Sequence, residues 1–182
     1  MPFVGPGSTK TPADGSVDTA QLVDDAVTDP KLADGMVVQM VNVQDGTTST
    51  GTTLFPIDTS TPQNTEGNEF MTLAITPKST TNKLRIDVVA SFTNTSANST
   101  LASGLFQDST ADALTAIAAS RNAGANEIVN IAFTHWMTAG TISETTFKVR
   151  GGASVAGTTT FNAGHFTGIV ASSITITEIK AS

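Results

Sequence analysis

Histidine and cysteine are the side chains whose chemistry is easiest to recognise in a sequence, and this chain has two of the first and none of the second. A Ser-His-Asp triad would have to use His135 or His165, and neither lies in a G-x-S-x-G context or a similar nucleophile motif. His135 precedes Trp136, which favours a packed or interface position. His165 could gather a metal or an anion near a three-fold axis, but a single histidine without a second ligand beside it is a weak metal signal. We therefore expect no catalytic residues and no enzymatic activity.

Carboxylates are the other group with candidate chemistry. The first part of the chain holds Asp24, Asp25, Asp29 and Asp34. Their spacing does not match a calcium-binding EF-hand loop, so helix caps and turns explain them better. Glu66 with Glu69 and Asp108 with Asp112 are candidate pairs for glycoside hydrolysis, a reaction whose carboxylates are recognised by their distance in space and not in sequence. The sequence therefore predicts no metal and no cofactor.

The overall charge excludes two classes of partner. The formal net charge is −7, with only nine Lys and Arg in 182 residues. Binding to nucleic acid or to an anionic membrane needs clustered cations, so neither partner is expected. No 18-residue apolar stretch and no signal-peptide pattern are present, which favours assembly in a cytoplasm.

The first 37 residues show an unusual periodicity. Apolar residues recur every five positions, at Val17, Leu22, Val27, Leu32 and Val37. An α-helix would spread such positions around its axis, and a strand would place them on alternate faces. Short helical turns that return one aliphatic side chain to a common line fit better, but one such row cannot offset the entropy of ordering the backbone. An ordered state therefore needs other chains; the alternative is a disordered acidic linker.

The segment before this repeat is broken by three prolines and three glycines in fifteen residues. Phe3 and Val4 are nevertheless apolar, and we interpret them as an anchor that inserts into a partner surface, with fraying as the alternative. We divide the chain into an extended anchor (1–14), a repeat-containing stalk (15–37) and a packed domain (38–182).

From Met36 onward the hydrophobic pattern has the period of two that is typical of strands. In the clearest run, residues 84, 86, 88, 90 and 92 are apolar while 85, 87 and 91 are polar. Similar runs cover 37–43, 70–75, 101–106, 113–118, 128–137, 145–150, 158–161, 166–171 and 174–179. Turn-forming clusters separate them, Gly151-Gly152 among them. Eight to ten short strands without a core helix predict an all-β, antiparallel β-sandwich.

The run 128–137 carries large apolar groups on both faces. We assign Val129 and Trp136 to one side and Ile128 and Phe133 to the other. A strand buried on both sides must contact something beyond its own sandwich, and a neighbouring subunit is the economical candidate. The predicted subunit-packing residues are Ile128, Val129, Ile131, Phe133 and Trp136. The predicted receptor-contact residues, in loops of the domain, are Asn94, Asn98, Arg150 and Gly152.

The ten-residue repeat resembles the VTxAKLADGAV-type repeats of tailed-bacteriophage fibre proteins, in which three chains wind together in a stalk. The C-terminal half, with TFKVRGG at 146–152 and SITITEI at 173–179, resembles the trimeric jelly-roll heads of such fibres, which are similar to tumour-necrosis-factor-like jelly rolls. The resemblance touches most of the chain from Gly15 to Ile179. The stalk here has only two repeats, and no large tail-docking domain is recognisable.

This resemblance implies a homotrimeric virion protein. Phe3 and Val4 would dock on another virion protein, the five aliphatic residues of the repeat would line the trimer axis, and the head would attach to a host surface glycan or protein. A capsid-attached head fibre or decoration protein shares these features and remains an alternative, and a glycan-degrading spike is a weaker one.

Overall fold

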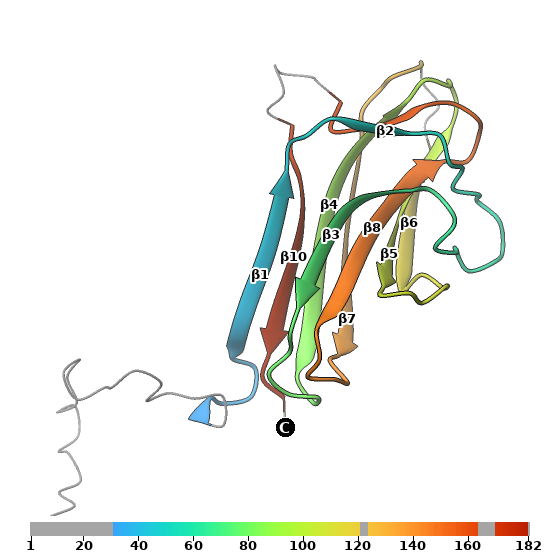
Figure 1. The fold of residues 1–182 in the computed structure, drawn as a ribbon. Coiled ribbons are helices and arrows are strands. Elements are labelled where there is room, and N and C mark those ends of the chain that lie inside the picture. Colours follow the sequence, from blue (N-terminus) through green and yellow to red (C-terminus); the bar gives the residue numbers. More distant parts are fainter. Residues whose placement is uncertain (1–30, 121–123, 164–169, 182) are drawn as a thin grey trace, which may run out of the picture. The chain divides into compact units, whose positions relative to one another are not determined.

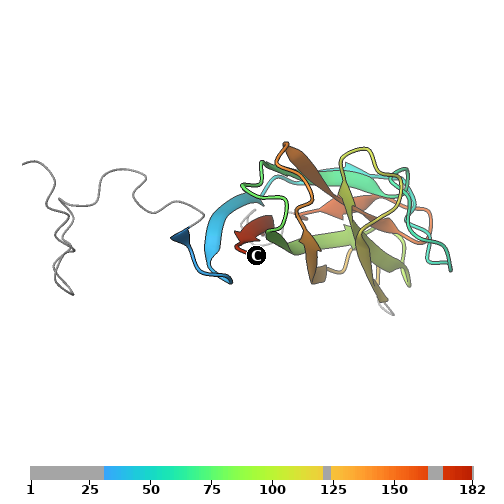
Figure 2. The ribbon, with the colours of Figure 1, turned by 90° about the horizontal axis from the view of Figure 1, so that it is seen from below.

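The computed structural model describes residues 31–120, 124–163 and 170–181. The chain divides into two compact units, Met1–Leu32 and Ala33–Ser182. The second unit contains the ten strands of the described residues, arranged as two antiparallel sheets packed face to face (Figures 1 and 2). None of the described residues forms a helix that could cross a bilayer.

Four long strands make up most of the first sheet. They are, in spatial order, β1 (Val37–Asp45), β10 (Ser172–Ile179), β4 (Lys83–Asn94) and β7 (Val129–Thr138). The short strand β9 (Thr159–Phe161) pairs with the last residues of β4, and β2 (Ser49–Gly51) pairs with β9. All pairs are antiparallel, and neighbours such as β1 and β10 are far apart in sequence.

The second sheet has four strands in the order β3 (Asn68–Ile75), β8 (Thr145–Ala153), β5 (Thr100–Gln107) and β6 (Thr115–Ser120). The chain crosses repeatedly between the two sheets, which gives the predicted jelly roll. The predicted run 113–118 overlaps β6, which begins two residues later. In the predicted run 166–171, positions 166–169 lie outside the described residues, and Val170 and Ala171 precede β10.

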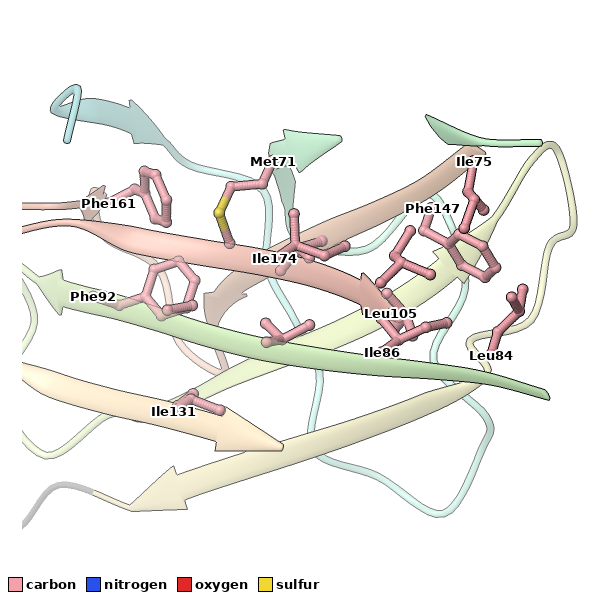
Figure 3. Close-up of a cluster of buried hydrophobic side chains, with 14 of the residues drawn as sticks. Met71, Ile75, Leu84, Ile86, Phe92, Leu105, Ile131, Phe147, Phe161 and Ile174 are labelled. Atoms are coloured by element: carbon pink, nitrogen blue, oxygen red, sulfur yellow. The ribbon is translucent and has the colours of Figure 1, made fainter. Parts of the chain in front are cut away.

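The alternation predicted for 84–92 is confirmed. Leu84, Ile86, Val88, Ala90 and Phe92 are each at most 1% exposed. They pack against residues of the second sheet such as Met71, Leu105 and Phe147 (Figure 3). At one end of the core, the rings of Phe70, Phe92 and Phe161 lie 5.1 to 5.7 Å apart between centroids. Aromatic contact at this separation adds to the stabilisation from burial.

The face assignment within β7 is wrong. Odd-numbered residues of β7 point towards the core and even-numbered ones point outward, because side chains alternate strictly along a strand. Val129 therefore shares the inward face with Ile131 and Phe133, whereas Trp136 lies on the outer face.

A loop, residues 52–67, covers the outer face of the second sheet. Phe55 is 1% exposed, and its backbone N–H donates to the carbonyl oxygen of Ala153 at 2.9 Å. A Cβ atom on Gly104 would lie 3.2 Å from Cζ of Phe55, and one on Gly152 would lie 2.8 Å from the carbonyl oxygen of Thr53. Glycine inside a strand thus allows the loop to approach the sheet closely. The turn predicted at Gly151-Gly152 is wrong, since both residues lie within β8.

A buried carboxylate closes one end of the sandwich. Glu178 of β10 is fully buried. Its carboxylate accepts hydrogen bonds from Nε2 of Gln39 (2.6 Å), Nδ2 of Asn82 (2.7 Å) and the backbone N–H groups of Lys78 (2.8 Å) and Ser79 (3.3 Å). Four donors satisfy a charge that burial alone would make costly. Glu178 thus ties β10 to β1 and to the turn between β3 and β4.

Candidate interface on the exposed sheet face

The outer face of the β1–β10–β4–β7 sheet carries exposed apolar side chains from three of its strands. The strand register aligns its residues in rows across four strands. One row is Met40, Thr177, Arg85 and Trp136; the next is Asn42, Thr175, Asp87 and Thr134; the third is Gln44, Ser173, Val89 and Ala132. Neighbouring strands lie about 4.8 Å apart, so each row spans roughly 14 Å.

Three large apolar side chains are uncovered on this face. Met40 is 64% exposed, Trp136 54% and Val89 46%. Single exposed apolar residues are ordinary. These three lie apart on one face, Met40 and Trp136 at the two ends of the first row and Val89 in the third row, with mostly Thr, Ser, Asn and Ala side chains around them. An open hollow of about 310 Å³ adjoins Val89 and is lined in part by Ala132 and Phe133. This is the candidate site, and we call it the exposed sheet face.

The charges at the centre of the exposed sheet face are paired with each other. Nε of Arg85 lies 3.0 Å from Oδ2 of Asp87, and the hydroxyl of Thr134 donates to Oδ1 of Asp87 at 2.6 Å. The Arg85 guanidinium also lies 6.0 Å from the centroid of the Trp136 ring, at the outer limit of a cation–π contact. A surface ion pair of this kind contributes at most about 1 kcal/mol to stability. It does leave the face nearly neutral, which lowers the cost of removing water from it.

The structure divides the predicted subunit-packing residues into two groups. Ile131 is 2% exposed and therefore not available to a neighbour, whereas Val129 and Phe133 are partly buried and pack against the core. Trp136 is exposed, as is Ile128 at 37%, just before β7. Met40 and Val89 were missed. Both are large apolar residues at outward positions of an alternating strand, which is a signal that the sequence contains.

Most of the predicted receptor residues have structural roles. Asn94 is fully buried, and its side chain donates to the Thr159 hydroxyl at 3.0 Å. Gly152 lies under the loop that carries Phe55, and Arg150 donates to the carbonyl oxygens of Glu66 (2.9 Å) and Gly67 (2.8 Å). Asn98 is exposed, with a positive φ of 52°. Asn98 is thus the one residue of the four that presents its side chain to solvent.

The stalk and anchor predictions fall almost wholly on positions that the structure does not describe. Phe3, Val4, Val17, Leu22 and Val27 lie outside the described residues. Leu32 is half-buried, and Val37, the first residue of β1, is 57% exposed. The trimer axis therefore remains a prediction.

The carboxylates considered for catalysis accept hydrogen bonds from backbone and amide N–H groups. Glu66 accepts from the backbone N–H of Gln63, and Asp108 accepts from that of Thr146. Asp112 accepts from Nε2 of Gln63. His135 is half-buried on the inward side of β7, and this burial lowers its pKa below the ordinary value. Over the part of the chain that the structure describes, no three His, Cys, Asp or Glu side chains gather as a metal site would require; His165 is outside it.

The comparisons with known proteins concern the fold alone. No protein-family model and no curated protein matches this sequence. Among solved structures, the chain is similar to the Eiger TNF of S. frugiperda, with 12% identity, 79% of this chain and 94% of that chain covered, and a TM-score of 0.45. It is also similar to a structure of infectious bursal disease virus, Gt strain (9% identity, 82% and 39% covered, TM-score 0.39). The enzymatically active domain of tailspike protein 4 from bacteriophage CBA120 is a more distant match (18% identity, 67% and 18% covered, TM-score 0.29). The chain thus has distant structural resemblance to a TNF-like protein and to viral and phage tailspike β domains.

Proposed function

We propose that this chain is a structural protein of a tailed-phage virion: a short homotrimeric fibre, docked to the particle by its N-terminal segment, whose jelly-roll head attaches to the host surface. The observation that carries the proposal is the exposed sheet face, where Met40, Val89 and Trp136 are uncovered and the central charges are already paired. A second copy of the same chain is present wherever the protein is made, so it is the economical partner for this face.

The ten-residue repeat supports the fibre rather than another kind of trimer. Its five aliphatic residues cannot form a core within one chain, so the same assembly that covers the exposed sheet face would also cover them. The role is mechanical and adhesive rather than chemical. Three weak head contacts to a receptor, displayed together, would bind with the avidity that one head lacks.

A charge within the repeat tests the stalk separately from the head. Leu22→Asp places three carboxylates near one axis if the stalk is a trimer, and repulsion in a desolvated site opposes its assembly. We expect loss of helical signal in circular dichroism together with an unchanged cooperative unfolding transition of the sandwich. A stalk signal that is unaffected by the substitution would contradict the bundled arrangement.

Deleting the gene from the phage that encodes it tests the place of the protein on the particle. A tail fibre for host attachment predicts intact particles that adsorb to cells more slowly. A capsid-attached head fibre or decoration protein predicts normal adsorption and particles that lose integrity on heating. Purified wild-type particles that lack the protein would contradict both roles, and shortening of host polysaccharide by the purified protein would favour the spike enzyme instead.

A further inference from the structure

The edge of β6 is a second candidate binding surface. It belongs to the β3–β8–β5–β6 sheet, which packs opposite the sheet that carries the exposed sheet face. Among the described residues, β6 pairs with β5 alone, so one side of its backbone has no strand partner. Its sequence, TAIAAS, contains no charge, no proline and no bulge. Those are the devices by which proteins usually prevent an edge strand from pairing with another chain.

A groove adjoins this edge. The loop that carries Phe55 runs across the sheet and is fixed near the start of β6, where the N–H of Ala113 donates to the carbonyl oxygen of Pro62 at 2.9 Å. Between the loop and the sheet lies an open space of about 210 Å³, lined mainly by apolar residues that include Ile57, Pro62, Ala102 and Ala118. Ala102 and Ala118 face each other in the strand register, and such small side chains leave room for those of a partner.

The surroundings of the groove are acidic. The two segments beside it, residues 52–67 and 108–120, contain Asp58, Glu66, Asp108 and Asp112. One cation, Arg150 of β8, contacts the first segment at the carbonyl oxygens of Glu66 and Gly67. Asp58 lines the groove, and the N–H (2.7 Å) and hydroxyl (2.5 Å) of Ser60 both donate to it. These hydrogen bonds from Ser60 lower the pKa of Asp58, so it carries its charge at neutral pH.

The charge decides which occupant fits. A second copy would bring the same four carboxylates to the edge, and like charges would oppose the pairing. The N-terminal 35 residues of the chain carry six Asp against two Lys, so they fit no better. We propose that the edge of β6 and the adjoining groove bind an extended peptide with alternating apolar and basic side chains, which extends the β3–β8–β5–β6 sheet by one strand. Backbone hydrogen bonds would give affinity and the groove would select side chains.

A synthetic peptide tests this inference with the full-length protein. The probe is a fluorescein-labelled octapeptide of alternating Val and Lys, followed by fluorescence anisotropy. We expect saturable binding in the micromolar range, and none for the Val-Glu peptide or for an analogue with methylated backbone nitrogens. No binding of the Val-Lys probe, or equal binding of the methylated analogue, would overturn the proposal.

Matched substitutions place the site. Ala118 on β6 and Thr72 on β3 are exposed residues on the two opposite edge strands of this sheet. Ala118→Lys should weaken binding about tenfold because it brings a cation against a basic peptide, whereas Thr72→Lys should leave it unchanged. Asp58→Asn should weaken binding about threefold, the size of an exposed charge contact. The inference fails if Thr72→Lys has the larger effect, or if Ala118→Lys lowers the mass of the unliganded protein, which would assign the edge to a second copy. Circular dichroism confirms that each variant is folded.

Discussion

The two sheets of the sandwich differ in what covers their outer faces. The chain covers the β3–β8–β5–β6 sheet with its own residues 52–67, and Phe55 in that loop is as buried as the core. It leaves the β1–β10–β4–β7 sheet bare, with Trp136 and Met40 more than half exposed. The outer face of the β3–β8–β5–β6 sheet is therefore covered when a single chain folds. The outer face of the β1–β10–β4–β7 sheet has the composition of a surface that a neighbouring molecule covers.

The largest effect expected from this comparison is on the covered face. Phe55→Ala removes a buried ring between the loop and two strands, and truncations of this kind cost about 3–5 kcal/mol in the free energy of unfolding. Denaturant unfolding measures the change. Leu54→Ala, at a neighbouring residue that is 42% exposed, is the control and should cost less than about 1 kcal/mol. Equal effects of the two substitutions would show that the loop does not function as a cover.

Glu178→Gln tests whether the buried carboxylate holds β10 in place within the uncovered sheet. The neutral amide cannot accept the same four hydrogen bonds, and one of its own N–H groups would face donors, so we expect a loss of about 2 kcal/mol. Glu69→Gln is the control, since that side chain is 38% exposed. A cost below about 0.5 kcal/mol at Glu178 would mean that the buried carboxylate does not hold β10 in place.

Trp136→Ala tests the bare face directly. The side chain is 54% exposed, so its removal should change the unfolding of the isolated subunit by less than about 1 kcal/mol. It should raise the protein concentration at which the trimer dissociates by about tenfold, which is about a hundredfold in the dissociation constant of a trimer and corresponds to about 2.7 kcal/mol per trimer. Dilution series in analytical ultracentrifugation measure this, and Val155→Ala, exposed elsewhere, is the matched control. An unchanged dissociation concentration would assign the association to another surface.

The smallest effect concerns His135, which lies beside Trp136 in sequence but on the inward side of β7. Because burial lowers its pKa in the folded state, the unfolded chain takes up the proton first as the pH falls below about 6.5. Stability from this residue is therefore complete above that pH and declines below it. His135→Gln should make the denaturation midpoint less sensitive between pH 7.5 and 5.5, whereas an unaltered pH dependence would contradict the inward placement.

Sequence patterns predicted this fold where one face of a strand is apolar and the other polar. β4 is such a strand, and the predicted face is the buried one. In β7 both faces carry large side chains, so the pattern does not identify the inward face. The assignment of Val129 and Trp136 to one face was wrong for a simpler reason: they are seven positions apart, and strict alternation puts residues at an odd separation on opposite faces.

Local sequence patterns could not predict that residues 52–67 pack over the second sheet. Their contact depends on Gly104 and Gly152, which lie far from Phe55 along the chain, and Gly-Gly is also a common turn signal. The structural roles of two predicted receptor residues were not foreseen either. Asn94 is fully buried and donates to the Thr159 hydroxyl, and Arg150 donates to two backbone carbonyl oxygens of the covering loop. Glu178 could have been suspected, since a carboxylate that alternates in phase with two buried isoleucines points inward.

The mass of the full chain in solution tests the central claim most directly. Sedimentation equilibrium at micromolar concentration should give three times 18.7 kDa, about 56 kDa. The central claim is that the exposed sheet face and the repeat are both covered by identical copies of the chain. A mass of 18.7 kDa that does not increase with concentration would contradict it.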